Sequence, residues 1–116
     1  AVGMVTVVDE GELDAVTGLS GSGPAYVFLL AEAMIAAGVE QGLSAQVADA
    51  LGRQTVLGAA MLLAGSSDSP AQLRSNVTSP GGTTAAAIAA MQALKFEEIV
   101  AEGIAAAVAR SMELGG

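Results

Sequence analysis

The pattern of apolar and polar positions changes once along the chain, close to Leu13. Before that point, "GMVTVVDEG" alternates apolar and β-branched residues and then turns acidic, which is typical of one short strand. After it, long runs rich in Ala, Leu, Val, Ile and Met are broken only by short polar segments, which is the pattern of consecutive helices. The sequence therefore predicts an all-α fold, preceded by a strand without a partner strand.

Local signals place the helix boundaries. Pro24 suits an early helical position, Gly42 suits a helix stop, and Ser44 suits the cap of the next helix. Before Pro24, "LDAVTGLSGSG" is expected to pass from a turn of helix into a Gly/Ser-rich loop. About five helices are predicted, approximately Pro24 to Gln41, Ala45 to Ala64, Pro70 to Asn76, Thr84 to Leu94 and Phe96 to Leu114.

Two of these helices are apolar on nearly every side. Between Tyr26 and Val39 the only charged residue is Glu32, and between Thr55 and Ala64 there is none. A helix that is hydrophobic all round is normally buried all round. A bundle of about five helices has too little material to cover these faces, so we expect a second copy of the chain to cover them in an obligate oligomer.

Composition and charge exclude several classes of function. At 116 residues, with 53% hydrophobic and 14% charged residues, the chain is long and apolar enough for one folded domain. A net charge of −8 and only four basic residues argue against nucleic acid and anionic membranes as partners. The absence of Cys and His removes Ser-His-Asp catalysis and the usual structural zinc sites, and no metal is expected.

No signal-peptide pattern is recognised, and the most apolar stretch, "AYVFLLAEAMIAAGV", carries Glu32 and is expected to be too short to span a bilayer. These features predict a cytoplasmic protein without a membrane partner.

The segment "VTSPGGTT", Val77 to Thr84, holds the most distinctive chemistry. It opens a predicted helix, whose first N–H groups have no partners within the helix. Glycines 81 and 82 allow the backbone to bend and a ligand to approach it, while Ser79, Thr83 and Thr84 add hydroxyls. Such a helix entrance suits an anion, and a carboxylate fits better than a polyphosphate because the loop has no Lys or Arg. The alternative is that these hydroxyls only cap the helix.

A second Gly/Ser element, "TGLSGSGPAY", also lies at a helix entrance, and the two elements could face one pocket. The alternative is that its glycines serve close packing. It matches neither a nucleophile elbow nor a dinucleotide fingerprint, because Ser22 and Tyr26 stand where those motifs require glycine.

The stretches "LDAVTGLSGSGPAYVF" and "SPAQLRSNVTSPGGTTAAAI" together resemble the C-terminal domain of pyrroline-5-carboxylate reductase, from about Val7 to the end of the chain. This resemblance implies NADH- or NADPH-dependent reduction of Δ1-pyrroline-5-carboxylate to L-proline. It implies a helical domain that intertwines with a second copy as a homodimer, often assembled further into a decamer. The substrate would lie at the dimer interface, on a loop formed by Val77, Ser79, Pro80, Gly81, Gly82, Thr83 and Thr84.

The same resemblance assigns roles to two hydroxyls and divides the chain. Thr17 would lie near the ring nitrogen, and Thr17 and Thr84 would orient the ring and assist proton handling. Residues 1–12 would be the last strand and linker of an absent dinucleotide-binding (Rossmann) domain, which would hold most of the cofactor, and residues 13–116 the helical domain. Two alternatives stay open: a purely structural helical oligomerisation module, or the helical half of another imine or hydroxyacid reductase.

Overall fold

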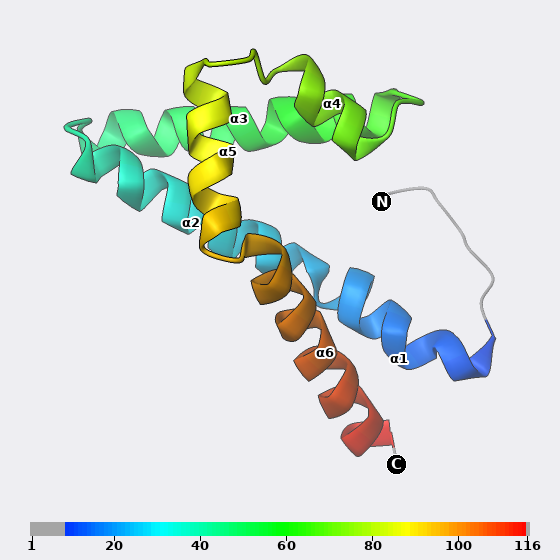
Figure 1. The fold of residues 1–116 in the computed structure, drawn as a ribbon. Helices are drawn as coiled ribbons and strands as arrows, with labels where there is room; N and C mark the ends of the chain where they lie inside the picture. The colour runs from blue at the N-terminus through cyan, green and yellow to red at the C-terminus, as the bar shows by residue number, and fades with distance from the viewer. Residues whose placement is uncertain (1–8, 116) are drawn as a thin grey trace. The chain divides into compact units, whose positions relative to one another are not determined.

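A computed structural model of the chain describes residues 9–115, which form helices and no strand (Figure 1). The predicted N-terminal strand lies outside these residues. The elements are the short helix η1 (Glu10–Glu12), α1 (Leu13–Val16), the π-helical turn η2 (Thr17–Gly21), α2 (Gly23–Glu40), α3 (Ala45–Gly65), α4 (Pro70–Asn76), α5 (Thr83–Ala93) and α6 (Phe96–Gly115). The all-α prediction and its five longer helices are confirmed to within one or two residues at each end.

The capping signals explain these boundaries. After α2, Gly42 adopts a left-handed φ of 109°, a conformation that glycine adopts without steric cost and that commonly ends helices. Ser44 Oγ then accepts a hydrogen bond from the Val47 N–H at 3.1 Å and caps α3. Ser69 Oγ accepts from the Gln72 N–H at 3.1 Å at the start of α4. The polar segments before α3 and α4 therefore each contain the serine that caps the following helix.

The expected Gly/Ser loop before α2 is wrong, because residues 13–21 are helical and lead into α2 with only a bend at Ser22. The turn η2 is held by a bond from the Ser22 N–H to the Thr17 carbonyl at 2.9 Å, the wide spacing of a π-helix. The Thr17 hydroxyl donates to the Leu13 carbonyl at 3.0 Å, and the Ser20 hydroxyl donates to the Val16 carbonyl at 3.1 Å. These hydroxyls reinforce the helix instead of opening a loop.

This correction lengthens the most apolar helical stretch. Residues Leu13–Glu40, 28 in all, are long and apolar enough to cross a membrane by length and composition alone, contrary to the expectation that the stretch is too short. This is weak evidence for a membrane, because an interior helix of a soluble protein meets the same criteria.

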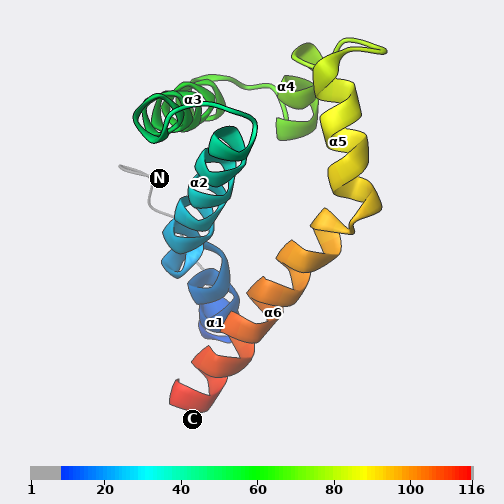
Figure 2. The same ribbon diagram turned by 90° about the vertical axis from the view of Figure 1, so that its left-hand side faces the viewer.

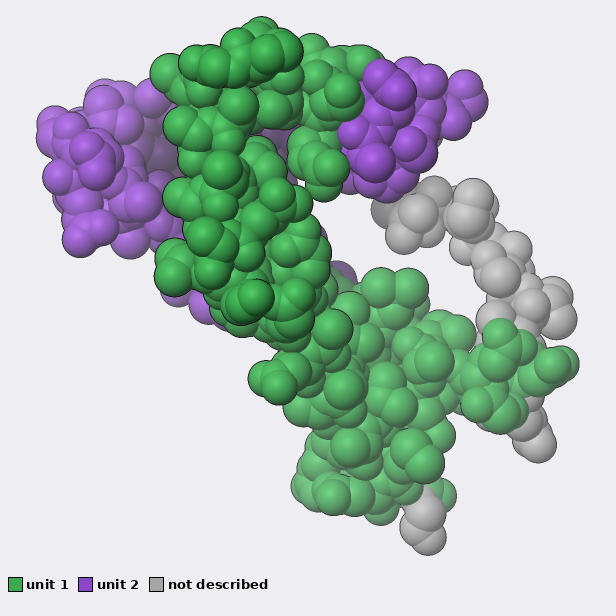
Figure 3. Space-filling model, in the orientation of Figure 1, with its two compact units in different colours: residues 1–23, 74–116 green, residues 24–73 purple. Residues whose placement is uncertain are grey.

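The chain divides into two compact units (Figure 3). In the unit of residues 24–73, α2 and α3 pack closely through small residues. A Cβ built on Gly52 would lie 2.6 Å from Ile35 Cγ1, and one built on Gly38 would lie 3.5 Å from the Ala48 Cβ. Beside this contact, the two helices line a cavity of about 610 Å³ whose lining residues include Val27, Phe28, Ile35, Val56 and Leu57.

The other unit contains the described residues up to 23 and from 74 onward. Within it, α1 and η2 pack against α6, and α5 meets α6 at a corner where Lys95 takes a left-handed φ of 65°. The corner is tied by the Gln92 side-chain amide, which donates to Glu97 Oε2 at 2.8 Å.

Among the residues that the structure describes, neither unit has a hydrophobic core of its own. Ala48, with 3% of its surface exposed, is the only buried apolar side chain among the described residues. Large apolar side chains on every long helix are exposed, among them Phe28, Leu29, Met61, Leu62, Met91, Ile99 and Met112. Because burial of apolar surface is the main favourable term in folding, helices of this kind require a covering partner.

Candidate functional site

The candidate site begins at the loop between α4 and α5 (Figure 1). The loop is ordered by its backbone: the Gly82 N–H donates to the Ser79 carbonyl at 3.0 Å and closes a tight turn. Pro80 and Gly81 form the corner of this turn, and Gly81 has a φ of 73°. Proline followed by a left-handed glycine is the sequence that such a turn favours. No atom lies within 4 Å of where a Gly81 Cβ would stand, so the backbone here is open to a ligand.

The start of α5 is not capped. Its N-cap residue is Gly82, and no side chain accepts a hydrogen bond from the first turn. Within the described residues, the first backbone bond into the helix is from the Ala86 N–H to the Gly82 carbonyl at 3.2 Å. The N–H groups of Thr83, Thr84 and Ala85 therefore have no carbonyl partner there.

The loop hydroxyls are equally unengaged. Ser79, Thr83 and Thr84 make no side-chain hydrogen bond within the described part of the chain, in contrast to Ser44 and Ser69, which cap α3 and α4. The alternative that the loop hydroxyls merely cap α5 is therefore wrong. Sequence reasoning anticipated the free amides of this turn in general but did not single out Ala85, which the helix-end rule alone could have identified.

The predicted loop residues lie at the surface. Exposed residues are Val77, Ser79, Pro80, Gly81 and Thr83, while Gly82 and Thr84 are half-buried. Three amide donors and three hydroxyls thus gather at the positive end of an 11-residue helix. Each charge-assisted hydrogen bond to an anion there would contribute about 1.5–3 kcal/mol. This donor set suits a small carboxylate.

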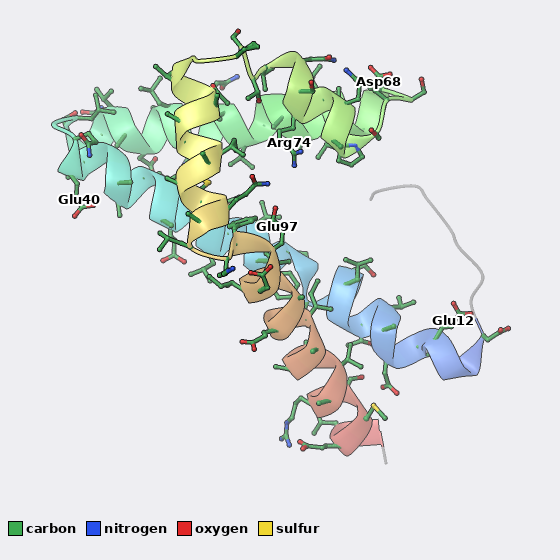
Figure 4. All side chains as sticks on the ribbon, viewed as in Figure 1. Glu12, Glu40, Asp68, Arg74 and Glu97 are labelled. Atoms are coloured by element: carbon green, nitrogen blue, oxygen red, sulfur yellow. The ribbon has the colours of Figure 1, made fainter. Side chains whose placement is uncertain are left out.

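Ionisable groups are sparse around the loop. Among the residues labelled in Figure 4, Arg74 lies in the last turn of α4, just before the loop, and Glu97 lies beyond the other end of α5. The Gln92 amide, with smaller effects from the Glu97 backbone N–H and Arg74, lowers the pKa of Glu97, so this carboxylate stays ionised at neutral pH. Among the described residues, no group of three or more acidic side chains is placed to hold a metal ion.

Thr17 is exposed on η2, and its hydroxyl proton is directed to the Leu13 carbonyl. The outward side of this oxygen therefore offers lone pairs, so Thr17 presents an acceptor to any ligand N–H.

The structure does not bring Thr17 and the loop together within one chain. The neighbour of Thr17, Gly18, packs on α6 near Ile104 and Val108, whereas the loop enters α5 at the end away from α6. The 11 residues of α5 alone extend about 16 Å. Figures 1 and 2 show this separation from two sides. One pocket lined by both elements therefore requires a second copy of the chain.

Comparisons with known proteins identify the family of the chain. Residues 10–114 match the family model described as pyrroline-5-carboxylate reductase dimerisation. The pyrroline-5-carboxylate reductase of Synechocystis sp. is 50% identical over 99% of this chain and 43% of its own length. That of Pseudomonas aeruginosa is 54% identical over 91% of this chain and 39% of its own length.

Solved structures give the same result. The crystal structure of Plasmodium falciparum pyrroline carboxylate reductase with NADP bound superposes with a TM-score of 0.90 at 35% identity, over 98% of this chain and 45% of that one. The enzyme from Coxiella burnetii gives 0.89 at 44% identity, over 93% of this chain and 40% of that one. The chain spans about two fifths of the length of the curated relatives it matches. The chain therefore belongs to the pyrroline-5-carboxylate reductase dimerisation family.

Proposed function

We propose that this chain is the substrate-binding and dimerisation part of an enzyme that reduces Δ1-pyrroline-5-carboxylate to L-proline with NADPH or NADH. The observation that carries the proposal is the uncapped entrance of α5, where the amides of Thr83, Thr84 and Ala85 lie free beside the loop hydroxyls. A purely structural oligomerisation module would gain stability from capping this helix, as α3 and α4 are capped. The names of the relatives favour this substrate over that of another imine or hydroxyacid reductase.

In the proposed complex, the substrate carboxylate accepts hydrogen bonds from the α5 amides and from the hydroxyls of Ser79, Thr83 and Thr84. The ring then extends away from the loop, with its nitrogen held by hydroxyl oxygen. The hydroxyl of Thr17 suits this role because its own proton is committed to Leu13. Its oxygen therefore accepts a hydrogen bond from the N–H of a protonated imine. The protonated imine is a better hydride acceptor than the neutral imine. The site works by positioning and charge, without a strong acid of its own.

The nicotinamide cofactor supplies the hydride. Residues 13–116 contain no glycine-rich dinucleotide fingerprint. We therefore assign most of the cofactor binding to a dinucleotide-binding domain outside this segment, with residues 1–12 as its last strand and linker. The helical residues hold the substrate's carboxylate and ring against that domain.

The dimer completes the site in this proposal. Because one chain keeps Thr17 apart from the loop, the loop of one copy is expected to share a substrate with Thr17 of the other. The exposed apolar surfaces of the helices supply the contact between copies, and further assembly of dimers into a decamer is part of the proposal. We expect the enzyme to be cytoplasmic and to act without a membrane or nucleic acid.

The test is steady-state kinetics of the full-length protein with Thr84 replaced by Ala. We expect KM for pyrroline-5-carboxylate to rise, kcat to fall, or both, with an unchanged dimer. Thr55→Ala is the matched control, because the Thr55 hydroxyl is already bonded to the Leu51 carbonyl at 2.7 Å on α3. Equal kinetics for both variants would refute the assignment of the loop.

A further inference from the structure

Helix α6 holds α1 and η2 at two points that lie one helical turn apart. At the first, the Ser111 hydroxyl donates a hydrogen bond of 2.7 Å to Asp14 Oδ1, joining residues that are 97 positions apart. At the second, Gly18 is buried against α6: a Cβ at this position would lie 2.7 Å from Val108 Cγ2 and 3.2 Å from the Ile104 carbonyl oxygen. Residues 14 and 18 lie on one face of the helical stretch because they are four positions apart.

The first of these contacts is specific. Asp14 and Ser111 are both half-buried, so their hydrogen bond is partly shielded from water. The nearby cation on α6, Arg110, is engaged with Glu113 at 3.0 Å. The Asp14 carboxylate therefore pairs with the Ser111 hydroxyl of α6, a directional hydrogen bond, and not with that cation. Gly18 is equally specific, because a side chain there would force the Val108 side chain or α6 itself to shift.

Thr17 lies between these two attachment points. The attachments leave its side chain exposed while they fix the turn that carries it. That turn is a π-helical one, a local widening that occurs frequently at functional sites. Its wide hydrogen bond, donated by the Ser22 N–H, is accepted by the carbonyl of Thr17 itself. A shift of η2 on α6 would therefore move the Thr17 oxygen directly.

From these contacts we infer that Asp14, Ser111 and Gly18 are positioning residues that hold the Thr17 hydroxyl in register for the ring nitrogen of the substrate. This inference rests on the proposed function, because it assumes that Thr17 meets the ring. The three residues act through Thr17 and do not touch the substrate. The hydroxyl at position 111 on the last helix is thus a determinant of turnover that the loop motifs do not reveal.

The test is a double-mutant cycle in the full-length enzyme, combining Ser111→Ala with Thr17→Ala. Ser111→Ala alone is expected to lower kcat/KM about tenfold, since small displacements of a positioning group are costly in rate. In the Thr17→Ala background the same change should have no further effect. Ser111→Thr, which keeps the hydroxyl, should restore most of the activity. Ser20→Ala is the matched control, because it removes a hydroxyl of η2 whose bond is internal to the helix.

The outcomes separate this inference from the proposed function. Equal losses from Ser111→Ala in both backgrounds would show a merely structural role and overturn the inference alone. Full activity of Thr17→Ala would overturn both the inference and the assigned role of Thr17, leaving the loop to be judged by Thr84→Ala. Should Ser111→Ala not form a dimer, Asp14→Ala removes the same hydrogen bond from the other side and must give the same non-additive cycle. Additive losses with Asp14→Ala would overturn the inference.

Discussion

Replacing Gly81 with Ala tests whether the loop backbone is open for a ligand or merely bent. Gly81 has a φ of 73°, and nothing lies within 4 Å of its missing Cβ. Within the chain, the cost of Ala is therefore backbone strain alone, about 1–2 kcal/mol in this conformation. In the proposed complex the new methyl group also stands where the carboxylate approaches. Loss of one charge-assisted hydrogen bond, about 1.5–3 kcal/mol, raises KM roughly 10- to 150-fold.

Gly42 provides the matched comparison for this experiment. It also has a positive φ, 109°, and open space around its missing Cβ, but it ends α2 and belongs to no proposed ligand site. Both Ala variants should lose similar thermal stability, measured by calorimetric unfolding of the full-length protein. Only Gly81→Ala should raise KM for pyrroline-5-carboxylate. If the two variants have the same KM, the loop is a turn without a ligand and the reasoning fails.

Three further predictions concern packing, pH and assembly. Gly52→Ala should lower the free energy of unfolding by about 1–3 kcal/mol in thermal melts, because the new Cβ would lie 2.6 Å from Ile35 Cγ1. A double variant that also carries Ile35→Ala should recover part of this loss. Gln92→Ala should destabilise the protein at neutral pH but not in acid, because the Gln92 amide lowers the pKa of Glu97 by a hydrogen bond to its carboxylate. This bond stabilises the folded state above the pKa of Glu97 in the unfolded chain, near 4.5, and the stabilisation is lost as the pH falls through the pKa in the folded protein. Parallel curves of stability against pH for the two proteins would contradict this. Phe28→Asp places a charge on the apolar lining of the cavity between α2 and α3. The variant should be a monomer by light scattering, because a second copy cannot cover an unpaired charge without a large cost. An intact dimer would show that the second copy does not cover this surface.

The sequence predicts the helices well because their ends carry local chemistry. Ser44 and Ser69 each seal a helix through an N–H only three residues away, and Gly42 supplies its own left-handed turn. Such contacts are decided by neighbours along the chain. The helical state of Thr17 to Gly21 is decided otherwise, because Gly18 packs against Val108 on the last helix. A Gly/Ser-rich segment is a loop by composition, and that distant contact, together with the bonds of the Thr17 and Ser20 hydroxyls within the segment, favours the helix.

The candidate site divides in the same way. The turn at Pro80 and Gly81 and the free amides after it follow from local backbone rules and were predicted from the sequence. In the proposed site, the relation of Thr17 to that turn depends on how two copies assemble, which no pattern within one chain specifies. The bond between Asp14 and Ser111 also joins positions whose residue types carry no signal of pairing.

The most direct test of the central claim is a crystal structure of the full-length dimer with L-proline bound. The account predicts carboxylate oxygens at about 2.7–3.1 Å from the amide nitrogens of Thr83, Thr84 or Ala85, with the ring nitrogen beside Thr17 of the other copy. A carboxylate bound elsewhere, while those amides face only water or the protein's own side chains, would contradict it.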